Sequence, residues 1–204
     1  MSTKRAYVSP LREQAAARTR ALILEQAELL FAERGYGRVT VADIAAAAGV
    51  ASKTVFASVG SKSDVLDRIV DKAVVGSGYE RAVARIMDVR TPDGVLRALA
   101  RGTRAGNESQ FKAHEAIRKA LPVHENGEAL WERATADYRE ALRAVARHFL
   151  EVGAPARRYS AEETADLLWF WFGPTGWRTL VVENGWSWDR AEEVLYRTAA
   201  SALA

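Results

Sequence analysis

The sequence contains no cysteine among its 204 residues, which excludes disulfide bonds, thiolate zinc sites and a cysteine nucleophile. Long hydrophobic runs are also missing. The apolar stretch Leu167–Phe172 has only six residues, far fewer than the roughly 20 that span a bilayer. No apolar segment follows the basic residues near the N-terminus, so we expect no signal peptide. These absences predict a soluble, cytoplasmic protein with no membrane partner.

Catalytic and metal-binding patterns are equally scarce. The three histidines, His114, His124 and His148, form no His-Glu-x-x-His pair. None of them follows a glutamate by three residues, as the ligands of helical diiron sites do. No glycine-rich phosphate loop follows a strand. We therefore expect that the protein is not an enzyme and that it has no metal and no cofactor.

Strand signals are rare, whereas Ala, Leu, Glu and Arg, which favour helices, are abundant. The predicted fold class is all-α. Glycines, prolines and capping residues divide the chain into about nine helices. These helices span about residues 12–34, 40–49, 52–58, 62–87, 91–104, 108–120, 126–152, 160–183 and 188 to the C-terminus.

Positive charge is concentrated in the first third of the chain, although the net charge is only +3. Residues 1–62 carry nine Lys/Arg and five Asp/Glu, a balance of +4, whereas residues 63–204 carry 20 and 21. A basic module joined to a neutral body indicates a polyanionic partner at one end. We therefore predict two domains, a basic arm and module at 1–62 that binds a polyanion and a helical body at 63–204.

The segment Thr40–Lys62 predicts two short helices joined at Gly49, a helix-turn-helix arrangement. Small Ala45 lets the helices approach closely, and Ile44 supplies part of their shared apolar contact. The second helix then presents short hydroxyl side chains and Lys53 to solvent, which suits a helix in the major groove. Structural helical hairpins also turn at glycine, so that alternative stays open at this point.

The longer segment Arg18–Leu66 resembles the N-terminal domain of the TetR family of transcriptional regulators. The matching positions are Leu30, Phe31, Gly35, Thr40, Ile44, Ala45, Ala48, Gly49, Val50 and Lys62. The resemblance implies an N-terminal three-helix DNA-binding domain that binds double-stranded DNA at a near-palindromic operator. The residues that it implies as DNA contacts are Arg18, Arg20, Thr40, Ser52, Lys53, Thr54, Phe56, Ser58 and Lys62.

The segment departs from the family pattern at three positions. Phe56 stands where the family usually has Tyr, Ser58 where it has His, and Val59 where it has Phe. The missing tyrosine hydroxyl removes one group directed at phosphate, so the operator sequence does not follow from the relatives. Basic residues of the arm either contact the DNA backbone or minor groove or form a solvated tail. These residues are Lys4, Arg5, Arg12, Arg18 and Arg20.

The same resemblance implies that residues 63–204 bind a small-molecule effector and form a homodimer. Five of the six tryptophans lie between Trp169 and Trp188, which suits an apolar pocket but is also typical of a core or an interface. The candidate effector contacts are Phe111, His114, Trp131, Tyr138, Trp169 and Phe172.

The last two helices are the expected dimer interface. Pro174, between Gly173 and Gly176, predicts a kink that lets another helix pack closely. The final helix carries an apolar face that needs a partner. The candidate interface residues are Trp177, Leu180, Val181, Trp188, Ala191, Leu195 and Thr198.

Together these features predict a ligand-responsive repressor that leaves its operator when a small apolar or aromatic effector binds. We expect the effector to shift the helix at 62–87, which links the body to the DNA-binding module. A DNA-binding regulator without an effector remains an alternative, as does a small all-α enzyme.

Overall fold

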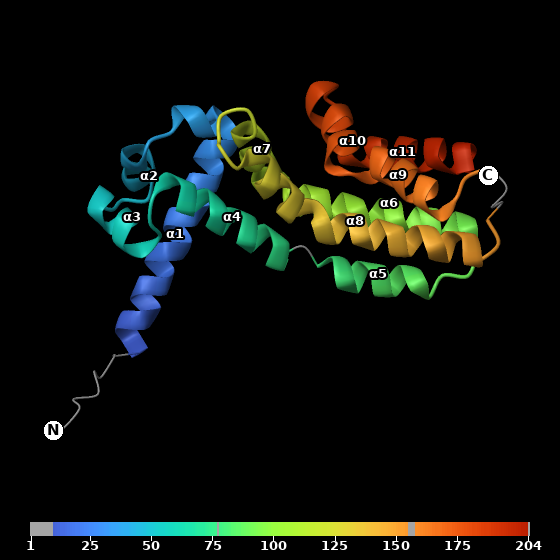
Figure 1. Ribbon diagram of the computed structural model, residues 1–204, viewed down its shortest axis with the longest axis horizontal. Helices are drawn as coiled ribbons and strands as arrows, with labels where there is room; N and C mark the ends of the chain where they lie inside the picture. The colour runs from blue at the N-terminus through green and yellow to red at the C-terminus, as the bar shows by residue number, and fades with distance from the viewer. Residues whose placement is uncertain (1–9, 77, 155–157, 204) are drawn as a thin grey trace. The chain divides into compact units, whose positions relative to one another are not determined.

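The computed structural model describes residues 10–76, 78–154 and 158–203, and in this part of the chain it contains eleven α-helices and no β-strand (Figure 1). The predicted all-α fold class is confirmed. The chain divides into two compact units. The first contains the residues up to Lys72 and Lys112–Trp131, and the second contains Ala73–Phe111 and the residues from Glu132 onward.

This division differs from the single boundary predicted after residue 62. The helix α4 (Lys62–Gly76) continues past that position and carries the chain into the second unit. The segment Lys112–Trp131 belongs to the first unit, where Lys119 bonds to the end of the first helix and His124 bonds to α4. These contacts join residues far apart in the sequence, so local composition gives no sign of them.

The first unit contains α1 (Pro10–Arg34), the 3-10 turn η1 (Tyr36–Arg38), α2 (Val41–Ala47), α3 (Ser52–Ser58), the start of α4, most of α7 (Phe111–Ala120) and the start of α8 (Gly127–Glu151). α1, α2 and α3 pack on one another (Figure 1). Fully buried apolar side chains from these helices and α4 form the core: Ile23, Phe31, Ile44, Val55 and Leu66. Each short helix is held by burying one face.

Local signals fix the turn between α2 and α3. The hydroxyl of Thr40 accepts a hydrogen bond from the backbone N–H of Asp43, and the Asp43 carboxylate accepts one from the Thr40 N–H. These two bonds form a capping box at the start of α2. Gly49 has a φ of +66°, a left-handed conformation that strains other residues. The helix α3 begins at Ser52, and Ala51 precedes it without a side-chain cap.

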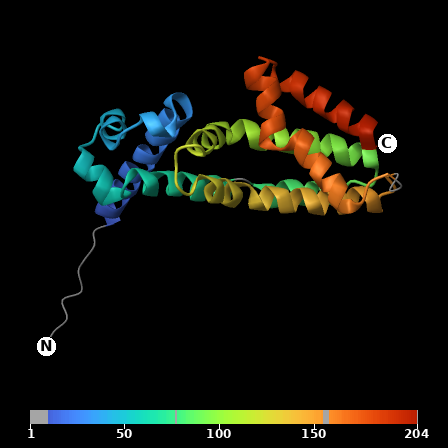
Figure 2. The same ribbon diagram turned by 45° about the horizontal axis from the view of Figure 1, so that its top comes forward.

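The second unit contains the end of α4, α5 (Tyr79–Met87), α6 (Pro92–Ser109), the rest of α8, α9 (Ala161–Phe172), α10 (Pro174–Arg178), the π-helical turn η2 (Thr179–Glu183) and α11 (Trp188–Leu203). α11 packs against α6 and α9, and α5 packs against α6 (Figure 1, Figure 2). The core includes Leu96, Leu142, Val145, Leu168 and Phe172.

Two of the predicted helices are each divided in the structure. The helix expected at 62–87 forms α4 and α5, and Gly78 between them has a φ of +64°. The helix expected at 160–183 ends at Phe172, and Pro174 starts α10. Proline suits a first helical position because it has no N–H to donate. A side chain at Gly173 would collide with the carbonyl of Trp169, so this glycine permits the break.

The break predicted between the helices at 91–104 and 108–120 is misplaced, because α6 continues through Gly106 to Ser109. A glycine inside a helix costs only about 1 kcal/mol relative to alanine. The neighbouring Asn107 is buried and donates a hydrogen bond to the carbonyl of Thr103 at 2.8 Å. Tertiary burial therefore outweighs the local preference for a turn.

No single helix in the described residues is long and apolar enough to cross a membrane. The pair α2 and α3 reaches that length and composition only when the two helices are taken together, and they are bent by 98°.

Candidate nucleic-acid interface and ligand chamber

The helix α3 presents most of its predicted DNA contacts to solvent. Val55 anchors the helix by burying its side chain completely. On the other sides Ser52 and Lys53 are exposed, Phe56 is 55% exposed, and Thr54 is half-buried. This surface combines hydroxyl groups, one cation and an aromatic ring on a helix that is fixed from behind. Such a helix can enter the major groove of DNA.

Arg20 supports the end of α3. Its Nε donates a hydrogen bond to the carbonyl oxygen of Ser58 at 3.0 Å. The bond joins α1 to the last residue of α3, so it fixes the angle between these two helices. Arg20 itself is exposed, and Ser58 is half-buried.

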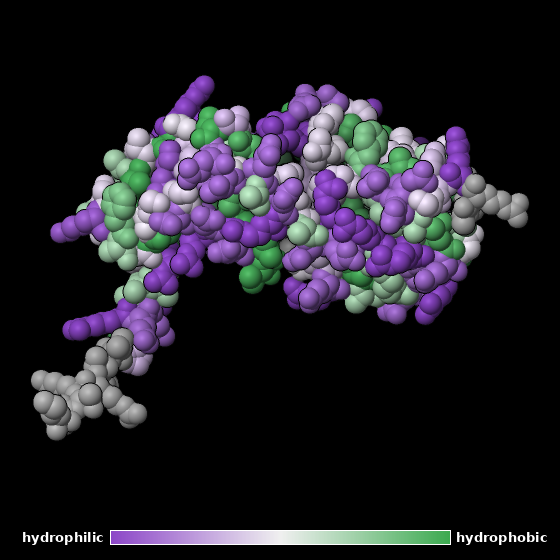
Figure 3. All heavy atoms as spheres, in the orientation of Figure 1, coloured by the Kyte–Doolittle hydropathy of each residue, from purple (hydrophilic) through white to green (hydrophobic). Residues whose placement is uncertain are grey.

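The start of α1 is exposed along its first turns. Arg12 and Arg18 are both exposed there, and hydrophilic side chains gather on this part of α1 at the lower left of Figure 3. Lys4 and Arg5, the other basic residues predicted in the arm, lie outside the described residues.

Thr40, one of the predicted DNA contacts, uses its hydroxyl in the cap of α2. The hydroxyl donates to the Asp43 carboxylate at 2.6 Å, and the Asp43 N–H donates to the hydroxyl at 3.1 Å. The hydrogen bonds that the Asp43 carboxylate accepts from the hydroxyl and the backbone N–H of Thr40 hold the pKa of Asp43 below its usual value. Ser61 and Asp64 repeat the arrangement at the start of α4. Among these three helices, only α3 has no acidic residue in its first turn.

Lys62 also has a role within the fold that the sequence did not reveal. Its ammonium group donates hydrogen bonds to the carbonyls of Tyr36 at 3.1 Å and Val39 at 3.0 Å, and lies 4.2 Å from the centre of the Tyr36 ring. The predicted DNA contact of this side chain stays a prediction beside this role within the fold. Lys62 fastens η1 to α4.

The six predicted effector contacts are divided between the two units. His114 and Trp131 belong to the first unit, with ring centres 6.1 Å apart. Burial lowers the pKa of His114 to about 4, although the Glu115 carboxylate acts in the opposite direction. His114 is therefore neutral at pH 7. The other four residues, Phe111, Tyr138, Trp169 and Phe172, belong to the second unit.

Tyr138 is the centre of the polar interior of the second unit. Its ring stacks on Tyr79 with centres 4.6 Å apart, and the edge of Trp169 lies 5.6 Å away. Its hydroxyl accepts a hydrogen bond from Asn107 at 3.1 Å and donates one to the carbonyl of Phe172. Burial raises the pKa of Tyr138 well above its usual value, so the hydroxyl keeps its proton. Phe111, in contrast, contacts Trp188, with ring centres 6.2 Å apart.

The sequence prediction missed Tyr79, Thr103 and Asn107 in this interior. A small cavity of about 20 Å³ lies between α5, α6 and α8, and Tyr79, Thr103 and Tyr138 line it. The sequence does contain a pattern that could have indicated Thr103 and Asn107. The two residues are four apart, so they lie on the same face of a helix whose other residues on that face are apolar. In the described residues no group of three or more His, Asp or Glu side chains is arranged to hold a metal ion.

The predicted dimer residues separate into two classes. Trp177, Ala191 and Leu195 are buried in the core of the second unit, which corrects their assignment to an interface with another chain. The apolar stripe of α11 is used within the chain, against α6 and α9. The remaining predicted residues have exposed surface: Leu180, Val181 and Trp188 are half-buried, and Thr198 is exposed. Two further exposed apolar side chains, which the sequence analysis did not single out, are Phe170 and Val182.

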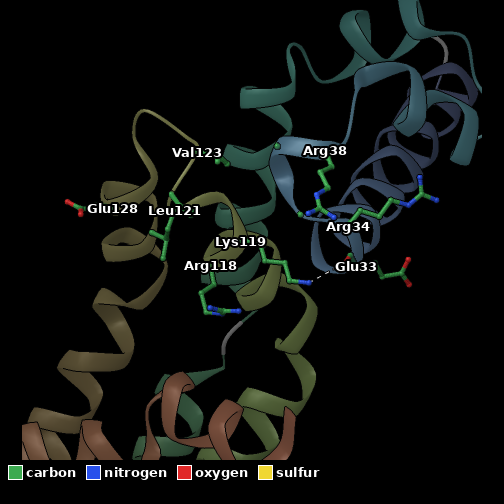
Figure 4. Close-up of a pocket in the computed structure, with 11 residues that line it drawn as sticks. Glu33, Arg34, Arg38, Arg118, Lys119, Leu121, Val123 and Glu128 are labelled. Carbon is green, nitrogen blue, oxygen red and sulfur yellow. Dashed lines mark hydrogen bonds between the residues drawn. The ribbon is translucent and has the colours of Figure 1, made fainter. Parts of the chain in front are cut away.

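A groove of about 850 Å³ belongs to the first unit (Figure 4). Arg38 and Lys119 point into it from different elements, whereas Glu128 points away. The ammonium group of Lys119 donates to the carbonyls of Ala32 and Glu33. A cation at the C-terminal end of a helix stabilises it, so Lys119 fastens α7 to the end of α1.

The N-terminal segment matches a known family of proteins. Residues 23–69 match the sequence profile described as bacterial regulatory proteins, tetR family. This segment contains about the second half of α1, the helix-turn-helix and the first turns of α4, and it confirms the resemblance predicted from Arg18–Leu66. No curated protein sequence matches the chain.

Solved structures share the fold over most of the chain. The TetR family transcriptional regulator PfmR from Thermus thermophilus is 24% identical, with a TM-score of 0.65, over 96% of this chain and 97% of that one. A transcriptional regulator from Saccharomonospora viridis in complex with choline is 23% identical, with a TM-score of 0.66, over 88% and 94%. A SmeT–triclosan complex is 18% identical, with a TM-score of 0.68, over 91% of both chains.

Proposed function

We propose that the chain is a dimeric, ligand-responsive repressor of transcription. Residues 23–69 match the N-terminal module of the tetR family of bacterial regulatory proteins. The chain also shares the fold of a TetR-family transcriptional regulator. In this proposal residues 1–62 form the DNA-binding domain and residues 63–204 form the effector-binding and dimerisation domain. The observation that carries it is the exposed face of α3, where Ser52, Lys53 and Phe56 reach solvent.

DNA recognition would use this face of α3 in the major groove. Ser52, Lys53 and Thr54 lie at the start of the helix, which is where a recognition helix meets base edges. Arg18, exposed on α1, would contact the phosphate backbone. Two copies related by a two-fold axis would read half-sites about 34–36 Å apart on a near-palindromic operator.

The dimer interface would lie on the exposed side of α9, η2 and α11. Phe170 is 70% exposed and Val182 is 43% exposed, and Leu180, Val181 and Trp188 are half-buried. Apolar side chains grouped on a surface indicate contact with another protein. An isologous dimer would cover this surface on both copies.

The effector would occupy the interior of the second unit around Tyr79, Tyr138 and Trp169. Aromatic walls with a few polar groups, here Thr103 and Asn107, are typical of small-molecule sites. The present cavity of about 20 Å³ holds about one water molecule, so an effector would displace side chains as it binds. The choline and triclosan complexes of proteins with this fold support a ligand chamber.

Effector binding would lower DNA affinity through α4, which runs from the first unit into the second. An effector that favours a different arrangement of α4 reduces operator affinity by the coupling free energy, typically about 1–3 kcal/mol. A regulator that has no effector is the second candidate, and the small volume of the cavity favours it.

Binding to DNA from upstream of the protein's own gene, measured by fluorescence anisotropy across a salt series, tests this function. We expect tight, sequence-dependent binding with a steep salt dependence. Lys53→Ala should weaken binding and lower the salt slope by about 1. Arg90→Ala removes the same charge from an exposed position of the second unit and should leave both unchanged.

Sequence-independent binding, or equal effects of the two variants, would contradict the proposed role of α3. The effector is tested by adding small molecules to the protein–operator complex. Release of the DNA by a compound that binds the second unit supports the ligand-responsive repressor. If no compound changes DNA affinity, the second candidate is favoured.

A further inference from the structure

A groove of about 630 Å³ lies on the second unit, between the junction of α4 with α5 and the outer side of α8. Much of its wall is apolar. Val74, Val75 and Val83 line one side, and Ala141 and Ala144 line the other. Val75 is 88% exposed. This groove therefore offers apolar surface that no other part of the described chain covers.

The groove meets the small inner cavity at Tyr79. Tyr79, Val83 and Ala141 line both the groove and the cavity of about 20 Å³ behind it. The Tyr79 ring stacks on Tyr138, and its hydroxyl makes no hydrogen bond within the described chain. Tyr79 therefore separates the groove from the interior, where stacking on Tyr138 and packing against the core hold it without a hydrogen bond from its hydroxyl.

Carboxylates dominate the charge of the groove. Glu80, Asp137 and Glu140 line it, and Arg81 is the one cationic side chain among its lining residues. The Glu140 carboxylate is neutralised by Arg143 at 3.1 Å and Arg147 at 3.5 Å.

Asp137 differs from Glu140 because it makes no ion pair within the described chain. Burial raises the pKa of the Tyr79 hydroxyl, and the negative charge of nearby Asp137 raises it further. Asp137 therefore contributes an unneutralised negative charge beside an aromatic ring. An aromatic face and a carboxylate attract an organic cation, and both repel an anion.

We propose that this groove is the mouth of the effector chamber and selects a small organic cation with an apolar substituent. The positive centre lies between Asp137 and the ring of Tyr79, and the apolar substituent contacts Val74, Val83 and Ala144. The inference rests on the proposed function, whose effector it assigns to a chemical class. Displacement of Tyr79 from Tyr138 then opens the path to the interior.

Three probes with the same chain length test the charge preference: hexyltrimethylammonium, 1-hexanol and hexanoate. Calorimetry and tryptophan fluorescence of the full chain without DNA measure binding, since Trp169 lies against Tyr138. The cation should bind about tenfold more tightly than the alcohol, the factor that corresponds to one cation–π contact with a nearby carboxylate. Hexanoate should bind more weakly than either.

Asp137→Asn should remove the preference for the cation over the alcohol. Asp137 is exposed, so the variant should fold, which circular dichroism checks. Asp166→Asn, at an exposed carboxylate of α9, is the matched control and should keep the preference. Equal affinity for cation and alcohol in the parent protein, tighter binding of hexanoate, or an unchanged preference in Asp137→Asn would overturn the inference.

The same probes separate this inference from the proposed function. If the cation binds in an Asp137-dependent manner but DNA affinity does not change, the groove assignment stands and the ligand-responsive role fails. If operator DNA is released by other compounds while the cation does not bind, the repressor stands and the assignment of the groove fails.

Discussion

The hydroxyl of Tyr138 donates a hydrogen bond to the backbone carbonyl of Phe172, where the chain breaks between α9 and α10. The indole N–H of Trp177 donates to the same carbonyl at 3.1 Å. Tyr138 lies on α8 and stacks on Tyr79 of α5. One side chain thus links the proposed chamber to the helix break between α9 and α10, within the segment that carries the proposed dimer surface.

Tyr138→Phe should therefore destabilise the protein by about 1–3 kcal/mol, because it removes two buried hydrogen bonds that each contribute about 0.5–1.5 kcal/mol. The measurement is the free energy of unfolding in urea. Tyr79→Phe is the matched control, since it removes a hydroxyl from the same ring stack that makes no hydrogen bond. Its effect should stay within about 0.5 kcal/mol. Equal losses in the two variants would show that the Phe172 bond adds no stability.

Lys62→Met distinguishes a fastening role from a phosphate contact. The variant removes an ammonium group that bonds the carbonyls of Tyr36 and Val39, so we expect a loss of about 1–3 kcal/mol in the free energy of unfolding. The salt slope of DNA binding should keep its parent value. A slope lower by about 1 with unchanged stability would identify Lys62 as a phosphate contact.

Stability should depend on pH through His114. Its folded pKa of about 4 lies below the ordinary value of 6.5, because the imidazole is buried beside Trp131. Between these values the unfolded chain binds a proton that the folded chain does not, so stability falls as pH decreases from 6.5 towards 4. The loss should reach up to about 3 kcal/mol.

His114→Phe removes this titration while the other two histidines remain. Urea unfolding at several pH values should show a smaller loss below pH 6.5 in the variant than in the parent. Parallel curves would mean that the imidazole takes up its proton as readily in the folded protein as in the unfolded chain.

Phe170→Ser tests the proposed dimer surface. The side chain is 70% exposed, so its removal should cost little folding stability, and it should weaken the dimer at least about tenfold if Phe170 is a central contact. Sedimentation velocity over a concentration series measures the change. Leu11→Ser, at a residue of the first unit that is 77% exposed, should leave dimerisation unchanged. A dimer of parent strength in Phe170→Ser would assign the interface elsewhere.

Helix type and most helix ends could be predicted from the sequence, because they depend on neighbours in the chain. The pairs Thr40 with Asp43 and Ser160 with Glu163 each form the expected capping box. The same holds for Pro92 at the start of α6 and for Gly49 in the turn after α2. These signals involve residues three or four apart, so no tertiary information is needed to interpret them.

Of the two candidate sites, only the DNA-binding surface could be predicted from the sequence, because its residues lie on one short helix. The exposed residues of α3 follow from the position of Val55, whose burial sets the phase of the helix. The chamber could not be predicted in this way, because Tyr79, Asn107, Tyr138 and Phe172 come from four different helices. Their hydrogen bonds and stacking join residues far apart in the sequence, which no periodicity reveals.

Local properties of the chain are enough to specify an all-α fold, a basic N-terminal module and its helix-turn-helix, because helix propensity, capping and charge balance act between near neighbours. Three other features depend on the packing of the folded chain: Lys62 fastens η1, His114 and Tyr138 lie in different units, and Leu195 is buried within the chain. Which of several apolar helix faces becomes core depends on the packing of all helices together, since burial is a property of the whole fold.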